Sequence, residues 1–241
     1  MSIKFSLVFL AFFACQGVFA SATEVSAFGI GEQIEKALKM LKIVIQEAID
    51  KAVEGLNNLL EKIIGDGTFL IEQIKYTIYK IVEDVKHQIQ KLVEETGVDV
   101  NECVKDLDKD LEKLVKGLLE SAVKCVTDKV DEATEIIDEA IKEIKDYVKI
   151  IDGFEKKKEK CGTGLGAIKC LGEVLSDVIK ATTALPVEIS KKVADITALI
   201  AGLKTAMIQC ATTVGIEAAG EAASIVIDVD ECIANKIKDS Q

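Results

Sequence analysis

Two pairs of cysteines with the same spacing constrain the fold of this chain more than any other feature. Cys103 and Cys125 lie 22 positions apart, and so do Cys210 and Cys232. In a helix, 22 residues span about 33 Å, too far for a disulfide within a pair, and the second sulfur returns to within about 40° of the first. Each pair therefore faces one side of a helix, and its partners must lie on another helix.

Two pairings satisfy both cysteines of each helix at once. Antiparallel helices would join Cys103 to Cys232 and Cys125 to Cys210, whereas parallel helices would join Cys103 to Cys210 and Cys125 to Cys232. The number of chain reversals expected between the two segments favours the antiparallel pairing. A straight, uninterrupted helix over residues 187–238 would instead favour the parallel one.

The N-terminus predicts export to an oxidising compartment. Lys4, an apolar run and Val18-Phe19-Ala20 form the pattern of a secretory signal peptide, residues 1–20, with cleavage expected after Ala20 and Ala22 as a second choice. An even number of cysteines then remains, which in a secreted, extracellular protein indicates disulfides.

The third disulfide is expected within a short segment. Cys161 and Cys170 flank three glycines, and glycine adopts the backbone angles that a tight turn requires. Bonding between these two cysteines would close the loop locally.

Helical periodicity dominates the rest of the sequence. Apolar residues recur at steps of three and four, which predicts helices over 33–64, 68–96, 99–151, 167–183 and 187–238, the last with a break near 212–215. The expected stops are Gly65-Asp66-Gly67, Asp152-Gly153, a loop over 155–166, and Pro186. The fold class is therefore all-α, a disulfide-braced bundle of about five to six long amphipathic helices. Two domains are expected: residues 21–97, an N-terminal helical hairpin without cysteines, and residues 98–241, the disulfide-braced bundle.

Residues 196–227 differ in composition from the other helical segments. They hold only three charged side chains, Lys204, Glu217 and Glu221. A helix that is apolar almost all round is central in a bundle or lies in a membrane. A membrane span over 196–216 would bury Lys204 and Gln209, so a buried central helix is the preferred interpretation.

Composition and motifs argue against nucleic-acid binding, metal binding, dinucleotide binding and catalysis. The formal net charge is −11 and every basic residue is a lysine, which is unfavourable for binding nucleic acid. The only histidine, His87, has no second histidine for a zinc site and no nearby nucleophile. The glycine loop at 162–166 lacks the preceding strand of a dinucleotide fold. No catalytic, cofactor-binding or metal-binding residues are therefore predicted, and no cofactor.

The leading functional hypothesis is a secreted, non-catalytic helical structural or interaction protein. The alternative is an extracellular carrier of lipid or another small hydrophobic ligand. Its lining would come from the apolar segment: Ile196, Leu199, Ile200, Leu203, Met207 and Ile225. Assembly of a homo-oligomer through the regular helix 33–64 is a third hypothesis, and an enzyme of unknown type is a fourth.

The signal peptide, the lysine–glutamate helices and the spaced cysteines together resemble small secreted helical proteins of insects, of the 27 kDa haemolymph glycoprotein type or the tsetse EP-like type. The likeness is one of general design over the mature chain. It implies an extracellular protein without known enzymatic activity.

Overall fold

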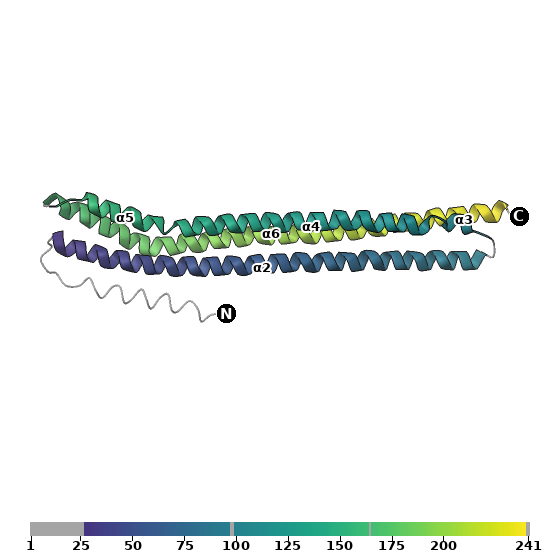
Figure 1. Ribbon diagram of the computed structural model, residues 1–241, viewed down its shortest axis with the longest axis horizontal. Coiled ribbons are helices and arrows are strands. Elements are labelled where there is room, and N and C mark those ends of the chain that lie inside the picture. The colour runs from purple at the N-terminus through teal and green to yellow at the C-terminus, as the bar shows by residue number, and fades with distance from the viewer. Residues whose placement is uncertain (1–26, 97–98, 164, 240–241) are drawn as a thin grey trace. The chain divides into compact units, whose positions relative to one another are not determined.

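The computed structural model describes residues 27–96, 99–163 and 165–239, so the predicted signal peptide lies outside the described residues. The helices are α2 (Ala27–Thr96), α3 (Asn101–Val104), α4 (Leu107–Asp146), α5 (Lys149–Lys160) and α6 (Leu165–Asp239) (Figure 1). No strand occurs in these three ranges. The predicted all-α class is confirmed for the described part of the chain.

The predicted number of long helices is wrong. The five labelled helices form three joined segments, namely α2, then α3 to α5, then α6, and not five to six long helices. Helix α2 has 70 residues and runs without a break through Gly65-Asp66-Gly67, so residues 21–97 do not form a hairpin. Each glycine inside a helix costs only about 1 kcal/mol relative to alanine, and packing of the helix offsets that cost. Helix α6, with 75 residues, likewise continues through Pro186 and through 212–215.

Helix α6 tolerates Pro186 because buried side chains hold the backbone on both sides of it. Leu185 and Ile189 are both in the core. Proline has no N–H, so one helical hydrogen bond is missing at this point. In the preceding turn, the hydroxyl of Thr182 donates a hydrogen bond of 2.9 Å to the carbonyl of Val178. The expected stop at this proline is therefore absent.

The connection between α4 and α6 also differs from the prediction. The expected stop at Asp152-Gly153 lies inside α5, and the charged residues 155–160, expected in a loop, form the end of that helix. The turn begins at Cys161, and Gly162 has a φ of 66°, a conformation that favours glycine. The loop is thus shorter than the sequence pattern suggested.

The chain divides into two compact units that do not coincide with the predicted domains. Unit 1 comprises residues up to 48 together with 146–187, and unit 2 comprises 49–145 together with 188–241. Helices α2 and α6 contribute to both units. Because each unit combines segments distant in sequence, a division at residue 97 does not describe the contacts.

Unit 1 packs part of α2 against α5 and the start of α6. Its core contains Ile34, Leu38, Leu41 and Ile45 from α2, Ile151 and Phe154 from α5, and Leu171, Val174 and Val178 from α6. Between α2 and α5, Lys158 Nζ lies 2.6 Å from Glu35 Oε1. Between α5 and α6, Lys157 Nζ lies 3.6 Å from Asp177 Oδ2.

Unit 2 is a three-helix arrangement in which α4 runs opposite to α2 and α6 (Figure 1). Its core is aliphatic and built from one stripe of each helix. These stripes contain Leu56, Ile63, Ile74, Ile78, Val85 and Ile89 from α2, Leu111, Leu118, Val126, Ile137 and Ile144 from α4, and Ile200, Met207, Val214, Ala218 and Ala222 from α6. Each helix therefore buries one side and exposes the other.

Candidate interaction face on helix α6

Two disulfides join the first half of α4, and the short α3 before it, to α6. Cys103 is bonded to Cys232 and Cys125 to Cys210, with Cα–Cα distances of 5.7 Å and 6.1 Å. These are the antiparallel pairs expected from the spacing. The chain reversals predicted at Pro186 and near 212–215 are absent, however, because 187–238 is one uninterrupted helix. The antiparallel pairing arises because α6 does not reverse at Pro186, so a single turn after α5 sets its direction.

The third disulfide, Cys161–Cys170, closes the turn between α5 and α6 as expected, with a Cα–Cα distance of 5.5 Å. All six of these cysteines lie beyond residue 100, and α2 contains none. No disulfide therefore joins helix α2 to its neighbours.

The apolar segment of α6 is not the buried centre of the bundle. Only 17% of its most apolar 18-residue window is buried, so the prediction of a central helix is wrong. The physical reason is that a three-helix arrangement has no central helix, and α6 buries only one stripe. The high mean hydropathy of this segment therefore comes largely from uncharged side chains that are exposed to solvent.

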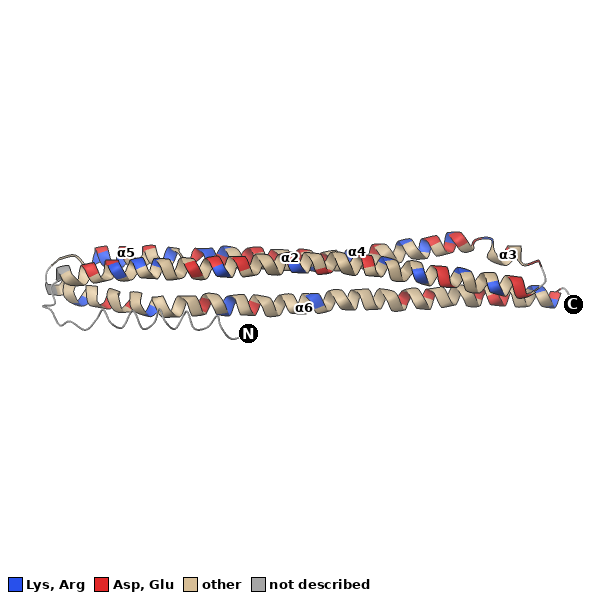
Figure 2. Cartoon of the chain, turned by 90° about the horizontal axis from the view of Figure 1, so that it is seen from below, with Lys and Arg blue, Asp and Glu red and all other residues tan. Residues whose placement is uncertain are grey.

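We call the solvent-exposed, uncharged side of this segment the outer face of α6. Leu199, Ile216 and Ile227 are its most exposed large side chains, at 56%, 68% and 56%. The rest of the face is mainly small: Thr197, Ala198, Ala201, Gly202, Thr205, Gln209, Thr212, Thr213, Ala219, Gly220, Ala223 and Ser224, with Ile208 at its edge. Glu217 and Glu221 are also exposed, beside its C-terminal part. Figure 2 shows long stretches of α6 without charged residues.

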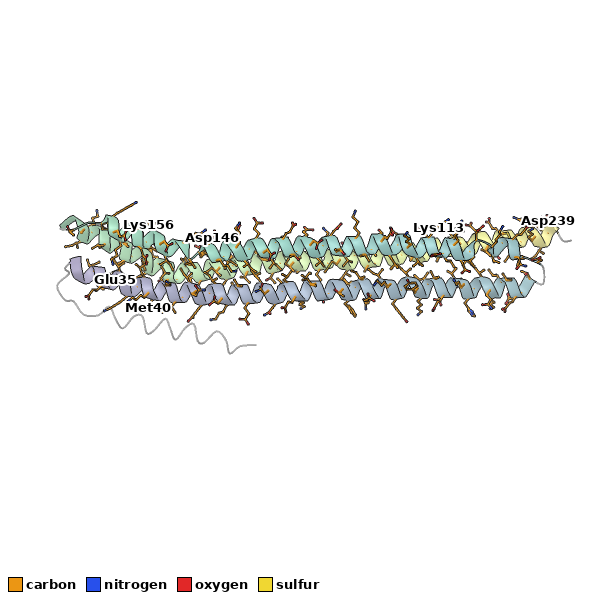
Figure 3. All side chains as sticks on the ribbon, viewed as in Figure 1. Glu35, Met40, Lys113, Asp146, Lys156 and Asp239 are labelled. Carbon is orange, nitrogen blue, oxygen red and sulfur yellow. A yellow bond between two sulfur atoms is a disulfide. The ribbon has the colours of Figure 1, made fainter. Side chains whose placement is uncertain are left out.

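Helix α4 of the same unit has a different surface. Its outward positions carry charged side chains such as Lys113 and Glu120, as expected for a solvated helix (Figure 3). Glycine and threonine at exposed helical positions instead cost about 0.5–1 kcal/mol each relative to alanine. Helix propensity therefore does not explain the composition of the outer face of α6.

Lys204 is the only cation in residues 196–227, and it does not lie on the outer face. Its Nζ lies 2.7 Å from Asp66 Oδ2 of α2, and the side chains are 42% and 31% exposed. The adjacent Gly67 brings α2 close to the other two helices, because a Cβ there would lie 2.7 Å from Val130 Cγ2 and 3.8 Å from Met207 Sδ. The ion pair and the close approach together hold the charge on the flank of α6 toward α2.

The six residues expected to line a ligand site are divided between the core and the surface. Ile200 and Met207 are in the core, and Leu199 is on the outer face. The other three are half-buried: Ile196, Leu203 and Ile225. The structure thus places them around α6 and does not bring all six to one side.

The described part of the chain offers no geometry for metal chemistry. Within residues 27–96, 99–163 and 165–239, no three His, Cys, Asp or Glu side chains are arranged to hold a metal ion. His87 lies exposed on α2. Two shallow surface hollows lie beside Phe69 and Tyr76 on α2 and beside Asp228 and Lys236 on α6.

Among the described helices, α6 alone is long and apolar enough to cross a membrane by length and composition. No protein-family model and no curated protein matches the chain. Among solved structures, a computationally designed three-helix bundle is similar at 15% identity, with a TM-score of 0.27, over 89% of this chain and 96% of that chain. A TM-score this low carries no argument about fold or function.

Proposed function

We propose that this protein is a secreted, non-catalytic interaction protein that acts through the outer face of α6. The observation that carries the proposal is the 17% burial of the most apolar window of α6 in an otherwise charge-covered chain. Contiguous exposed apolar surface on a soluble protein marks a site of contact with another apolar surface. Three intrachain disulfides support export, because such bonds persist in oxidising compartments.

The face suits a neutral partner that approaches closely. Its small side chains leave the backbone of α6 accessible, and no cation on the face would attract an anionic lipid surface. Acidic residues flank it at both ends, Asp195 on one side and Asp228, Asp230 and Glu231 on the other, and Glu217 and Glu221 are exposed between them. These carboxylates would repel phosphate groups.

The test compares the wild type with Leu199→Lys/Ile216→Lys. A matched control is Ser121→Lys/Thr127→Lys, which adds the same two charges at exposed positions of α4. We expect the wild type to associate with itself in sedimentation or with phosphatidylcholine vesicles in flotation. This association should be lost in the α6 variant and kept in the control. Absence of both associations at about 0.1 mM protein, a concentration that detects even weak binding, would overturn the proposal, as would equal loss in the control.

A second candidate function is that of an extracellular carrier of lipid or another small hydrophobic ligand. The observation that favours it is the distribution of the disulfides, which leaves α2 without a covalent bond to α4 or α6. Detachment of α2 would expose the aliphatic stripes of all three helices in unit 2 while α4 and α6 stay joined.

Locking α2 tests the carrier hypothesis. Lys86 of α2 and Asp108 of α4 form an ion pair of 2.6 Å, so cysteines at these two positions can be joined by a short bismaleimide. A carrier would bind a fluorescent fatty acid before cross-linking and lose most of that binding afterwards. Unchanged binding after complete cross-linking, or no displaceable binding in the wild type, would contradict it.

A further inference from the structure

We infer that the partner of the outer face of α6 is the same face of a second copy of the chain, crossed antiparallel near Thr212 and Thr213. This inference rests on the proposed function, since it names the partner of that face. An interface between identical copies that closes on itself must be self-complementary. The outer face meets this condition in its charge, its size and the order of its side chains.

Small side chains recur at three pairs of outer-face positions placed equally far from Thr212 and Thr213. In an antiparallel pair centred there, Ala198 would lie at the level of Ile227 of the other copy. Gly202 would likewise lie at the level of Ala223, and Thr205 at that of Gly220. Each of these three levels thus has at least one alanine or glycine, which leaves room for Ile227, whereas the two central levels pair Thr212 with Thr213 and Gln209 with Ile216.

The charges favour crossing in the neutral middle of the face. Residues 198–216 have no charged side chain on the outer face. Glu217 and Glu221 are exposed in its C-terminal part, and Asp195, Asp230 and Glu231 lie beyond its ends. Two copies running side by side over the whole length would bring these carboxylates together. Crossing at an angle lets the ends diverge, and a parallel pair would collect the acidic C-terminal ends of both copies at one place.

The size of the face predicts a weak dimer. Thirty residues of helix are about 45 Å long and about 10–12 Å wide, so about 500 Å² for each copy is an upper limit that the diverging ends reduce. The total therefore stays below about 1,000 Å², the lower limit for a specific interface. We therefore expect reversible dimers that dissociate on dilution.

The test measures mass by sedimentation and distance by spin labels attached to an added cysteine. Antiparallel crossing predicts that labels at Thr213 of two copies lie close together. Labels at Thr197 should lie about 46 Å apart along the helix axes, because 31 residues separate this position from its symmetric level. Thr213→Glu should raise the dissociation constant at least tenfold, whereas Thr127→Glu on α4, with the same change at an exposed position, should leave it unchanged.

Each outcome decides the inference. A concentration-dependent dimer with a short distance at Thr213 and a long one at Thr197 supports it. Short distances at both positions would show parallel packing and overturn it. A strict monomer that floats with phosphatidylcholine vesicles would also overturn it, while the proposed function of the face would stand. A strict monomer without vesicle binding would remove both.

Discussion

Lys204 Nζ lies 2.7 Å from Asp66 Oδ2, which joins the only cation of residues 196–227 to α2. Asp66 lies between two glycines of a continuous helix. The pair holds this positive charge away from the outer face of α6.

This ion pair is expected to make a small contribution to stability. Asp66→Asn should lower the free energy of unfolding by about 0.5–1 kcal/mol, because both side chains remain partly exposed. Chemical denaturation measures the change. In a double-mutant cycle with Lys204→Gln, the two changes together should cost less than their sum, and strict additivity would show that the two residues do not interact.

Replacement of Gly67 and of Gly65 by alanine should change the stability of the protein in opposite directions. A Cβ at Gly67 would lie 2.7 Å from Val130 Cγ2, whereas a Cβ at Gly65 meets nothing within 4 Å. Gly65→Ala should stabilise by about 0.5–1 kcal/mol through helix propensity. Gly67→Ala should destabilise by about 1 kcal/mol, because the crowding cost exceeds that gain. Equal stabilisation by both substitutions in denaturant titrations would show that α2 and α4 are not in close contact here.

Removal of the outer disulfide, Cys103–Cys232, should lower the free energy of unfolding. The loss depends on whether the inner disulfide, Cys125–Cys210, is present. The loop closed by Cys125–Cys210 lies inside that of Cys103–Cys232, with sequence separations of 85 and 129. With the inner bond present, the outer bond closes an effective loop of only about 45 residues. Cys103→Ala/Cys232→Ala should therefore cost about 4 kcal/mol in the loop-entropy model. Thermal unfolding under non-reducing conditions measures this, and a shift in melting temperature too small for 1 kcal/mol would contradict it.

Acid should weaken the contact of α2 with α5 in unit 1. The hydrogen bond and the charge of Lys158 hold the pKa of Glu35 below its usual value of 4.5. A carboxyl with a lowered pKa in the folded protein contributes stability above its unfolded pKa, and that contribution is lost as pH falls through the lowered value. Glu35→Gln should thus melt below the wild type at about pH 7 and match it at about pH 2. A difference that persists unchanged into acid would contradict this assignment.

The ion pair between Lys236 of α6 and Glu102 of α3 should respond to pH with the opposite sign. A hydrogen bond to Glu102, together with its charge, raises the pKa of Lys236 above 10.5. The stabilisation is complete below the unfolded pKa and is lost as pH rises through the raised value. Lys236→Met should therefore melt below the wild type at neutral pH, and the difference should disappear in strong alkali. A gap that remains there would show that Lys236 acts through packing.

The apolar period predicted the helical class and the inward residues well, because a stripe such as Ile34, Leu38, Leu41 and Ile45 records which side of a helix is buried. It did not predict where helices end. Gly65, Gly67 and Pro186 are local stop signals that packing overrides at a cost of about 1–3 kcal/mol each. Cysteine spacing predicted the disulfides because equal intervals in two helices restrict the pairing.

The outer face of α6 could not be recognised from hydropathy alone. A sequence window rich in Ala, Ile and Thr has the same mean hydropathy whether its second side faces a core or solvent. Whether the second side faces a core or solvent depends on how many helices pack around it. The helix end wrongly predicted at Pro186 led to too many helices and therefore to a buried second side. With α6 continuous, only α2 and α4 pack on this part of it in unit 2, and one side stays open.

Disulfide mapping tests the central claim most directly, namely that α6 lies antiparallel to α4 and is joined to it at two levels. A lysine-specific protease leaves Cys210 and Cys232 on one peptide, residues 205–236, so a second cleavage after Glu217 or Glu221 is required. The structure predicts linked peptides that contain Cys103 with Cys232 and Cys125 with Cys210. Peptides that link Cys103 with Cys210 and Cys125 with Cys232 would contradict it.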